Sequence, residues 1–281
     1  MTISCLSFNI WDLPIWLPKL SRKKRLAKLP QQISALAPDI ICLQESFRII
    51  SRQRLLSALS HFYHYAGSLK SRWMLPLLRA DRTGGVAVMS RFSFEDYEFV
   101  EHARFSRMRF DEKLGRKGFV VSLIKTAMGL IFVVNAHLYA GRSEIETDIR
   151  LQQLDGLFSY LQQHCPAEAP IILVGDFNAS PTTHFPSNTQ YEPTPEYERI
   201  MAEGFVDTLP HYGLENITYT GRSNVYAKLI IDASQIPKKL DYIFYRPGNK
   251  RIEAMEANVV FNNGDFLSDH NGVFCRLKIS E

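Results

Sequence analysis

The sequence of 281 residues contains no low-complexity tract, no Gly/Ser/Pro-rich linker and no run of about 18 apolar residues. The last absence excludes a membrane-spanning helix, because such a helix needs about 20 consecutive apolar residues. The first argues against a disordered chain, and the second favours a single domain over residues 1–281. Hydrophobic residues make up 46% of the chain, with 18 Phe and 12 Tyr, so a sizeable core is expected.

Net charge is low and cysteine is scarce. A formal charge of +4 suits a soluble enzyme and does not by itself indicate nucleic-acid binding. Cys5, Cys42, Cys165 and Cys275 form no CxxC pair, so we expect buried free thiols rather than zinc ligands or disulfides. The first apolar run is short and broken by polar residues, unlike a secretory signal peptide. A cytoplasmic protein, or one exported without a leader, is therefore expected.

Short apolar runs rich in β-branched residues alternate with amphipathic segments, as in an α/β protein. Strands are predicted at residues 3–10, 40–43, 85–89, 118–125, 130–136, 171–174, 240–245, 256–261 and 273–279. Several of these runs are apolar throughout, which predicts strands covered on both faces.

Helical spacing of apolar residues occurs at 26–36, at 51–60 and after Ser143. In the first of these segments, Pro30 predicts a kink or the start of a second helix. Ser143 and Glu146 have the spacing of a capping box, so the clearest predicted helix begins there.

Polar residues stand two apart at the ends of two predicted strands, as Asn135 with His137 and as Asp176 with Asn178. A step of two residues returns to the same side of a strand. Each pair is therefore expected to point one way at the carboxyl end of its strand, where ligands commonly bind in α/β sheets.

Taken singly, such strand ends have ordinary explanations, since a terminal Asn or Glu is often a turn residue and a lone His is often a core residue. Six of them together form a pattern. The motifs are Phe8-Asn9, Leu43-Gln44-Glu45, Asn135-Ala136-His137-Leu138, Gly175-Asp176-Phe177-Asn178, Leu240-Asp241-Tyr242 and Ser268-Asp269-His270. In this order they resemble the endonuclease/exonuclease/phosphatase superfamily, and the resemblance covers residues 3–279.

The resemblance implies an α+β fold of the α/β sandwich type, with four layers: two mixed β-sheets packed face to face and helices outside. It also implies hydrolysis of a phosphodiester with Mg²⁺, or with Mn²⁺ as a possible substitute. Mg²⁺ prefers a few carboxylate oxygens and keeps several waters. Glu45 is therefore the expected metal ligand, with Asn9 and Asp269 beside it.

The remaining motif residues receive catalytic roles from the same resemblance. His270 is expected to be the general base, with Asp241 accepting its other ring N–H and fixing the tautomer. Asp176 is expected to orient the attacking water. Asn178 and His137 are expected to donate hydrogen bonds to the non-bridging phosphate oxygens, where charge builds up during an in-line displacement.

Other segments bear on the substrate. The Asn-Ala-His-Leu motif is similar to the Asn-Thr-His-Leu of neutral sphingomyelinases and of several nucleases, whereas abasic-site endonucleases usually carry Tyr in place of the His. The run from Phe8 to Pro14 is similar to the Asn-x-x-Trp-(Gly/Asp)-x-Pro opening of neutral sphingomyelinases, and Leu138-Tyr139-Ala140 and Gly115-Arg116-Lys117-Gly118 resemble two further elements of that branch. The resemblance thus implies sphingomyelin or a related phospholipid as substrate, with Lys117 as a substrate contact.

Trp11 and Trp16 are candidates for peripheral membrane contact, because they precede the basic run at residues 22–25. Aromatic and basic groups together favour a lipid interface. A second apolar cluster at residues 73–78, flanked by arginines, has the same character. The alternative is that these aromatic residues fill the core and that the basic run is a solvated helix face.

Three other functions stay open. A nuclease is the first, because a basic stretch with interleaved aromatic residues would be able to follow a DNA or RNA backbone. That stretch contains Arg104, Arg107, Arg109, Lys113, Arg116 and Lys117, with Phe105, Phe110 and Phe119. A phosphoinositide or sugar phosphatase is the second, although Val174 stands where inositol polyphosphate 5-phosphatases have a Trp before Gly-Asp. An inactive binding module is disfavoured, since every expected polar position is filled.

Overall fold

The computed structural model describes residues 1–13, 22–59, 62–66, 83–183, 192–210, 213–221, 224–225, 237–264 and 266–281. The elements of this part of the chain form two mixed six-stranded sheets. The first sheet has the order β11–β12–β1–β2–β4–β3, and the second has the order β5–β6–β7–β8–β10–β9. Each contains one parallel pair, β1 with β2 and β7 with β8, among antiparallel neighbours.

The strands of the first sheet are β1 (Thr2–Asp12), β2 (Ile40–Ser46), β3 (His64–Ala66), β4 (Ala87–Ser90), β11 (Arg251–Val260) and β12 (Gly272–Ser280). Those of the second sheet are β5 (Phe94–Glu101), β6 (Gly118–Thr126), β7 (Gly129–His137), β8 (Ile171–Asp176), β9 (Val206–Asp207) and β10 (Asp241–Arg246). The helices are α1 (Arg22–Leu36), α2 (Ile49–Leu59), α3 (Phe110–Gly115), α4 (Glu144–His164) and α5 (Pro195–Ala202), with a 3₁₀ turn at Leu214–Asn216.

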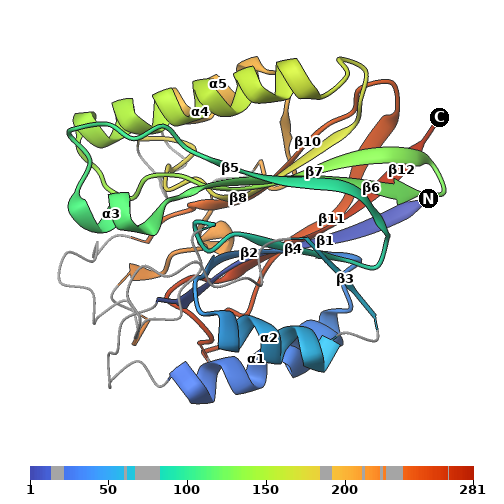
Figure 1. The fold of residues 1–281 in the computed structure, drawn as a ribbon, viewed down its shortest axis with the longest axis horizontal. Coiled ribbons are helices and arrows are strands. Elements are labelled where there is room, and N and C mark those ends of the chain that lie inside the picture. The colour runs from blue at the N-terminus through green and yellow to red at the C-terminus, as the bar shows by residue number, and fades with distance from the viewer. Residues whose placement is uncertain are drawn as a thin grey trace.

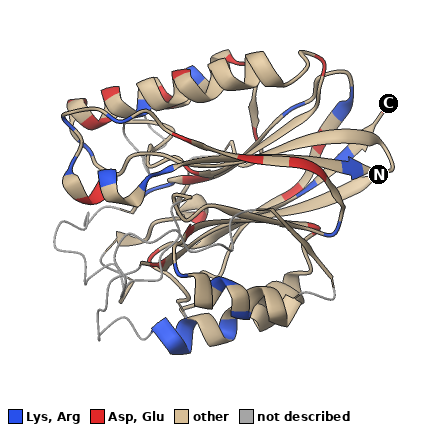
Figure 2. Cartoon of the chain, viewed as in Figure 1, with Lys and Arg blue, Asp and Glu red and all other residues tan. Residues whose placement is uncertain are grey.

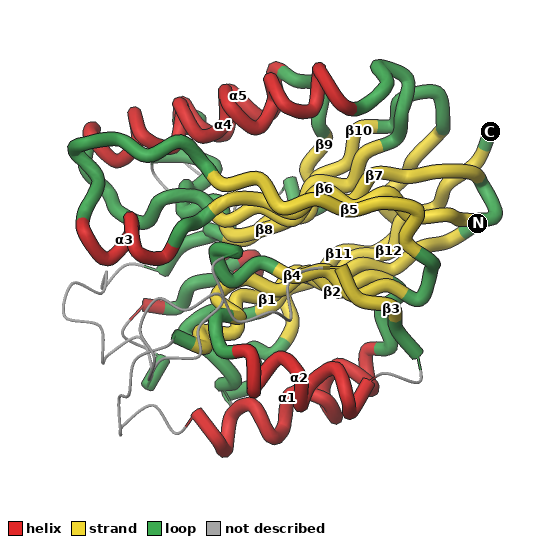
Figure 3. The backbone as a smooth tube through the Cα atoms, viewed as in Figure 1, coloured by secondary structure: helices red, strands yellow, loops and turns green. Residues whose placement is uncertain are grey.

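The two sheets lie face to face, with α1 and α2 outside the first sheet and α4 and α5 outside the second (Figures 1 and 3). This is the four-layer α/β sandwich that the motif resemblance implied. The innermost core lies between the sheets and includes Cys5 and Val88 of the first and Val133 and Ile243 of the second. Separate apolar layers join each sheet to its helices. The sheets are thus covered on both faces, as the continuous apolar runs predicted.

All nine predicted strands are present, with ends shifted by a few residues. The capping box of Ser143 and Glu146 is formed at the start of α4, and all four cysteines are buried and free. Pro30 does not begin a second helix, because α1 runs through it from Arg22 to Leu36. Within the described residues, no helix combines the length and the apolar character needed to cross a membrane.

Candidate active site

Strand pairing brings the polar strand ends to one edge of the sandwich. Asn9 of β1 lies opposite Gln44 of β2 in the first sheet. In the second sheet, Asp176 of β8 lies opposite both His137 of β7 and Asp241 of β10. Residues that are distant in sequence therefore meet because of their register, and the edge they share is the candidate active site.

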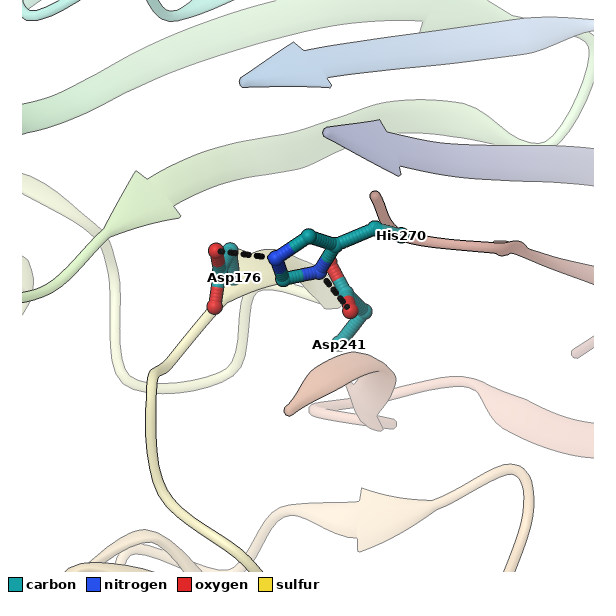
Figure 4. Close-up of side chains that lie close together, drawn as sticks. All are labelled: Asp176, Asp241 and His270. Atoms are coloured by element: carbon teal, nitrogen blue, oxygen red, sulfur yellow. Dashed lines mark hydrogen bonds and ion pairs between the residues drawn. The ribbon is translucent and has the colours of Figure 1, made fainter. Parts of the chain in front are cut away.

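His270 lies at the centre of this site, between two carboxylates (Figure 4). Its Nδ1 lies 2.8 Å from Oδ2 of Asp241, and its Nε2 lies 3.9 Å from Oδ2 of Asp176. All three residues are buried. The arrangement fixes the imidazole with Nε2 facing Asp176, which is the geometry expected of a base held by an orienting carboxylate.

Thr218 and Tyr219, which are adjacent in the chain, contact Asp241 and His270. The Oγ1 atom of Thr218 accepts hydrogen bonds from the backbone N–H groups of Leu240 (2.9 Å) and Asp241 (3.1 Å). The ring of Tyr219 packs edge-on against the His270 ring, with centroids 5.3 Å apart. Thr218 and Tyr219 were not predicted, and their loop carries no periodic signal that would have identified them.

The charges around His270 favour its protonated form. Burial by itself lowers the pKa of the imidazole, but the carboxylates of Asp241, Asp176 and Asp269 together raise it well above 6.5. In turn, burial raises the pKa of Asp241, against the opposing effect of His270. A cation placed among these carboxylates would lower the pKa of His270 and so favour the neutral ring that a base requires.

Glu45, the residue before the end of β2, has a left-handed backbone, φ 52°. Its Oε1 lies 3.9 Å from Nε2 of His137, and its buried Oε2 has no hydrogen-bond partner among the described residues. Burial, followed by the charge of Asp269, raises the pKa of Glu45 to about 7. Crowded carboxylates with an unsatisfied oxygen fit a hard divalent cation, which binds such oxygens.

A second group also has the spacing of a metal site, because ligand atoms of Asp176, Asp241 and His270 lie within 4.8 Å of one another. In this group, however, His270 Nδ1 is already engaged with Oδ2 of Asp241 at 2.8 Å, so the ring has only Nε2 left to offer a metal ion. The chemistry therefore favours Glu45 and Asp269 as the ion's ligands and leaves the other group for proton transfer.

Asn9 lies between these two groups. Its Nδ2 donates to Oδ2 of Asp176 at 2.9 Å, and its Oδ1 accepts from the Trp11 N–H at 3.0 Å. The side chain thus holds Asp176 in place, and its predicted part in metal binding stays a prediction.

His137 is fully buried, with Nε2 3.6 Å from Oδ2 of Asp176. Burial lowers the pKa of His137 well below 6.5, and the nearby charges of Lys117 and His270 act in the same direction. The ring is therefore neutral, and neither of its nitrogens has a hydrogen-bond partner among the residues that the structure describes. A neutral imidazole carries one N–H, which suits donation to a phosphate oxygen.

Asn178 follows β8 with φ 51°, a backbone conformation that Asn adopts more readily than most residues. Its N–H donates to Oδ1 of Asp176 at 3.0 Å, and its Nδ2 donates to the Leu138 carbonyl at 3.1 Å. Lys117 donates to the same carbonyl and pairs with Glu112, each at 3.1 Å. Lys117 is thus buried and engaged, and it acts on the site through its charge; its direct contact with substrate stays a prediction.

The structure describes one of the two tryptophans that were predicted to contact a membrane. Trp11 is only 5% exposed, and the Arg25 guanidinium lies 5.5 Å from its ring centroid. A ring buried in this way has no face to offer a membrane, so the structure corrects the membrane-contact prediction for Trp11 and favours the core alternative. Trp16 lies outside the described residues, as does the cluster at residues 73–78.

Two further residues support the site and were not predicted to do so. Gln44 donates to Oδ1 of Asn135 at 2.7 Å, and Asn135 donates to the Leu43 carbonyl at 2.9 Å, so this pair ties the two sheets together beneath the site. Arg25 donates to carbonyls of Trp11 and Leu267, which joins the end of β1 to the loop before Asp269. Neither role has a local sequence signal, because each of these hydrogen bonds joins residues that are distant in the chain.

The sequence matches the Endonuclease/Exonuclease/phosphatase family over residues 6–270, and the chain belongs to this family. With the site described above, it is an enzyme of the metal-dependent phosphoric diester hydrolase class.

Solved structures of three proteins illustrate the likeness of fold. Beta toxin from Staphylococcus aureus, in a mutant form with bound magnesium ions, is 19% identical with a TM-score of 0.68, over 98% of this chain and 99% of that one. D. rerio TDP2, complexed with a single-strand DNA product, is 16% identical with a TM-score of 0.69, over 99% of both chains. Sphingomyelinase C from Streptomyces griseocarneus is 20% identical with a TM-score of 0.66, over 98% of this chain and 99% of that one. No curated protein matches the sequence.

Proposed function

We propose that the enzyme hydrolyses the phosphodiester bond of sphingomyelin or a related phospholipid, with Mg²⁺ as its ion and Mn²⁺ as a possible substitute. The observation that carries the hydrolytic part is the His270–Asp241 pair, 2.8 Å apart, facing Asp176 beside a carboxylate with an unsatisfied oxygen. The lipid part is supported by the sphingomyelinase-like motifs and by the similar fold of sphingomyelinase C.

The side chains divide the chemistry among them. Asp241 holds Nδ1 of His270, so that Nε2 of the neutral ring accepts a proton from the attacking water. Asp176, fixed by Asn9 and by the Asn178 N–H, orients that water. His137 donates its N–H to a non-bridging phosphate oxygen, where negative charge builds up. An ion held by Glu45 and Asp269 would supply Lewis-acid polarisation of the phosphoryl oxygen.

The surface next to the site suits a lipid. Phe110 and Leu114 of α3 are 76% and 40% exposed and stand four residues apart, on the same face of the helix. The helix flanks the active site, because its Glu112 pairs with Lys117, whose charge acts on Glu45 and His137. An exposed apolar pair at the rim of a site is suited to contact a lipid surface.

The basic stretch that suggested a nuclease is largely neutralised within the protein. Arg104 and Arg116 both pair with Glu101, and Arg107 pairs with Asp148. Lys117 pairs with Glu112, and Phe119 is buried in the core. Most of the positive charge of this stretch is therefore paired within the protein, whereas Phe110 is exposed. A nuclease and a phosphoinositide or sugar phosphatase become the alternatives that the substrate test must separate.

The test compares substrates at matched Mg²⁺: sphingomyelin vesicles, inositol phosphates, supercoiled plasmid, short RNA and the soluble ester bis-p-nitrophenyl phosphate. We expect release of phosphocholine from vesicles, loss of this release with EDTA, and a loss of at least about 10²–10³ in rate for His270→Ala. Plasmid or RNA cleavage without phosphocholine release would overturn the lipid assignment. Activity that survives both EDTA and His270→Ala would overturn the mechanism.

A double variant tests whether the exposed apolar pair of α3 contacts the lipid surface. Phe110→Ala/Leu114→Ala should slow hydrolysis of vesicles and leave hydrolysis of the soluble ester unchanged. Leu130→Ala is the control, because Leu130 is 49% exposed and lies near the start of β7, away from the His137 end. Equal loss on both substrates would instead mean that α3 supports the structure of the site.

A further inference from the structure

A groove of about 780 Å³ lies between α1 and α2, on the outer side of the first sheet. We refer to it as the α1–α2 groove. Apolar side chains form much of its lining, namely Ile10, Leu26, Leu29, Ile50 and Leu55. Six basic residues also line it, namely Arg22, Lys23, Lys24, Arg48, Arg52 and Arg54. No Asp, Glu or aromatic residue is among the lining residues of the described chain.

The groove borders the end of β1 that carries Asn9 of the active site. Ile10 lines the groove and directly follows Asn9 on β1, and neighbouring residues of a strand point to opposite faces. Arg48 similarly lies three residues beyond Glu45. The groove and the active site are thus on opposite faces of one sheet, at its shared carboxyl end.

Within the described residues, only part of the positive charge of the groove is neutralised: Arg22 pairs with Asp12, and Arg52 is buried and hydrogen-bonded to Ser46 and Tyr65. Neither α1 nor α2 contains an acidic residue, and Figure 2 shows both helices with basic positions only. Lys23, Lys24 and Arg54 are exposed, and their side chains form no ion pair or hydrogen bond with the rest of the described chain. Asp12 adjoins the groove, but it is buried and already pairs with Arg22 at 3.1 Å.

This distribution opposes the usual charge preference of a helix. Negative side chains stabilise the first turn of a helix and positive ones destabilise it. The first turn of α1 nevertheless contains Arg22, Lys23 and Lys24. Internal contacts explain Arg25, which donates to the backbone carbonyl of Trp11, but they do not explain Lys23 and Lys24. An external anion would relieve the repulsion.

We propose that the α1–α2 groove binds the headgroups of anionic phospholipids at a membrane surface through its exposed basic side chains, Lys23, Lys24 and Arg54. Basic side chains near a membrane attract anionic lipids. A nucleic acid fits less well, because single strands bind through aromatic stacking and the groove has no aromatic lining. The proposal builds on the phospholipid substrate proposed above, since it presents the active-site edge to the same surface.

The experiment measures sedimentation of the full chain with vesicles of phosphatidylcholine alone and of phosphatidylcholine mixed with phosphatidylglycerol. The chain should bind the mixed vesicles more tightly, and the difference should shrink as salt rises. Lys23→Gln/Lys24→Gln should weaken binding to the mixed vesicles about thirtyfold. Lys125→Gln/Lys278→Gln is the matched control, because it removes the same charge from exposed positions outside the groove.

Two results would overturn the proposal: equal binding to both kinds of vesicle, or equal loss of binding in the two double variants. Single-stranded DNA that displaces the vesicles and loses affinity in Lys23→Gln/Lys24→Gln would assign the groove to nucleic acid instead. Hydrolysis of bis-p-nitrophenyl phosphate should be unchanged in this variant. If the chain binds vesicles as expected but does not cleave sphingomyelin, the proposed lipid-binding role of the groove is supported and the proposed substrate is refuted.

Discussion

Replacing Glu45 by Gln should stabilise the metal-free protein while removing its response to Mg²⁺. Burial and the Asp269 carboxylate raise the pKa of Glu45 from 4.5 to about 7, so the folded protein holds this proton more tightly than the unfolded chain. The stabilising contribution is therefore complete below pH 4.5 and is lost as pH rises through about 7.

The size of the effect follows from the pKa shift. The change from 4.5 to about 7 means that the ionised carboxylate costs about 3 kcal/mol at about pH 8. Glutamine has nearly the same shape and no charge, so Glu45→Gln should recover most of this amount. In the unchanged protein, a cation bound at the Glu45 carboxylate should offset the same free-energy cost, because a ligand that binds only the folded state stabilises that state.

Thermal unfolding in EDTA and in Mg²⁺ checks this reasoning. In EDTA at about pH 8, Glu45→Gln should unfold about 5 °C above the unchanged protein. Added Mg²⁺ should raise the midpoint of the unchanged protein and leave that of Glu45→Gln almost constant. Glu253→Gln, at an exposed position on β11, is the control and should differ by less than about 0.5 kcal/mol. A less stable Glu45→Gln, or an equal Mg²⁺ response in both proteins, would refute the argument.

Two further predictions concern the fixed geometry of the site. Asp241→Asn should lower kcat on bis-p-nitrophenyl phosphate by about 10²–10⁴. The same change should move the midpoint of the rise in activity with pH to lower pH, because it removes a carboxylate that raises the pKa of His270; an unchanged midpoint would contradict this role. Gly175→Ala should destabilise the fold in urea by about 3 kcal/mol or more, because φ is 151° and a Cβ would lie 1.9 Å from the Ala136 carbonyl oxygen. Gly156→Ala in α4, where a Cβ meets nothing within 4 Å, should instead stabilise by about 0.5–1 kcal/mol, and equal effects of the two changes would contradict the strain argument.

Strands with a strong apolar pattern were predictable, whereas weakly patterned ones were not. β7 and β8 are buried on both faces and stand out in the sequence as continuous apolar runs. β5 (Phe94–Glu101) forms an edge of the second sheet, is mostly solvent-exposed and contains four acidic residues, so it carries no such signal. β9 has two residues and exists only because β10 is beside it.

The helices show the same dependence on local signals. The capping box at Ser143 predicted the start of α4 correctly, because both partners lie within one turn. α5 also carried a recognisable start, with Thr194 as N-cap and Pro195 at the first helical position, but it was not predicted. The second helix predicted at Pro30 was wrong, because the apolar face of α1, with Leu29 and Ile33 buried against the first sheet, continues through it.

The residues of the site were predictable as a set because each follows or precedes a strand, and strands are local patterns. The register that brings them together was not predictable from any one segment. Asn135 illustrates the limit: it shares a side of β7 with His137, as expected, but its amide donates to carbonyls of Leu43 and Ala87 across the sandwich. That role exists only when the two sheets are packed together.

The sequence by itself determined the fold class, the family and the identity of the polar residues at the active-site edge. Only the tertiary structure decided their charge states. His137 is the last residue of β7 and His270 lies two residues before β12, and the two look equivalent as residue types, yet their pKa values shift in opposite directions. Burial beside Lys117 keeps His137 neutral, whereas the carboxylates of Asp241, Asp176 and Asp269 overcome burial at His270. Electrostatic energy depends on distances between charges, and those distances are set by packing rather than by position in the chain.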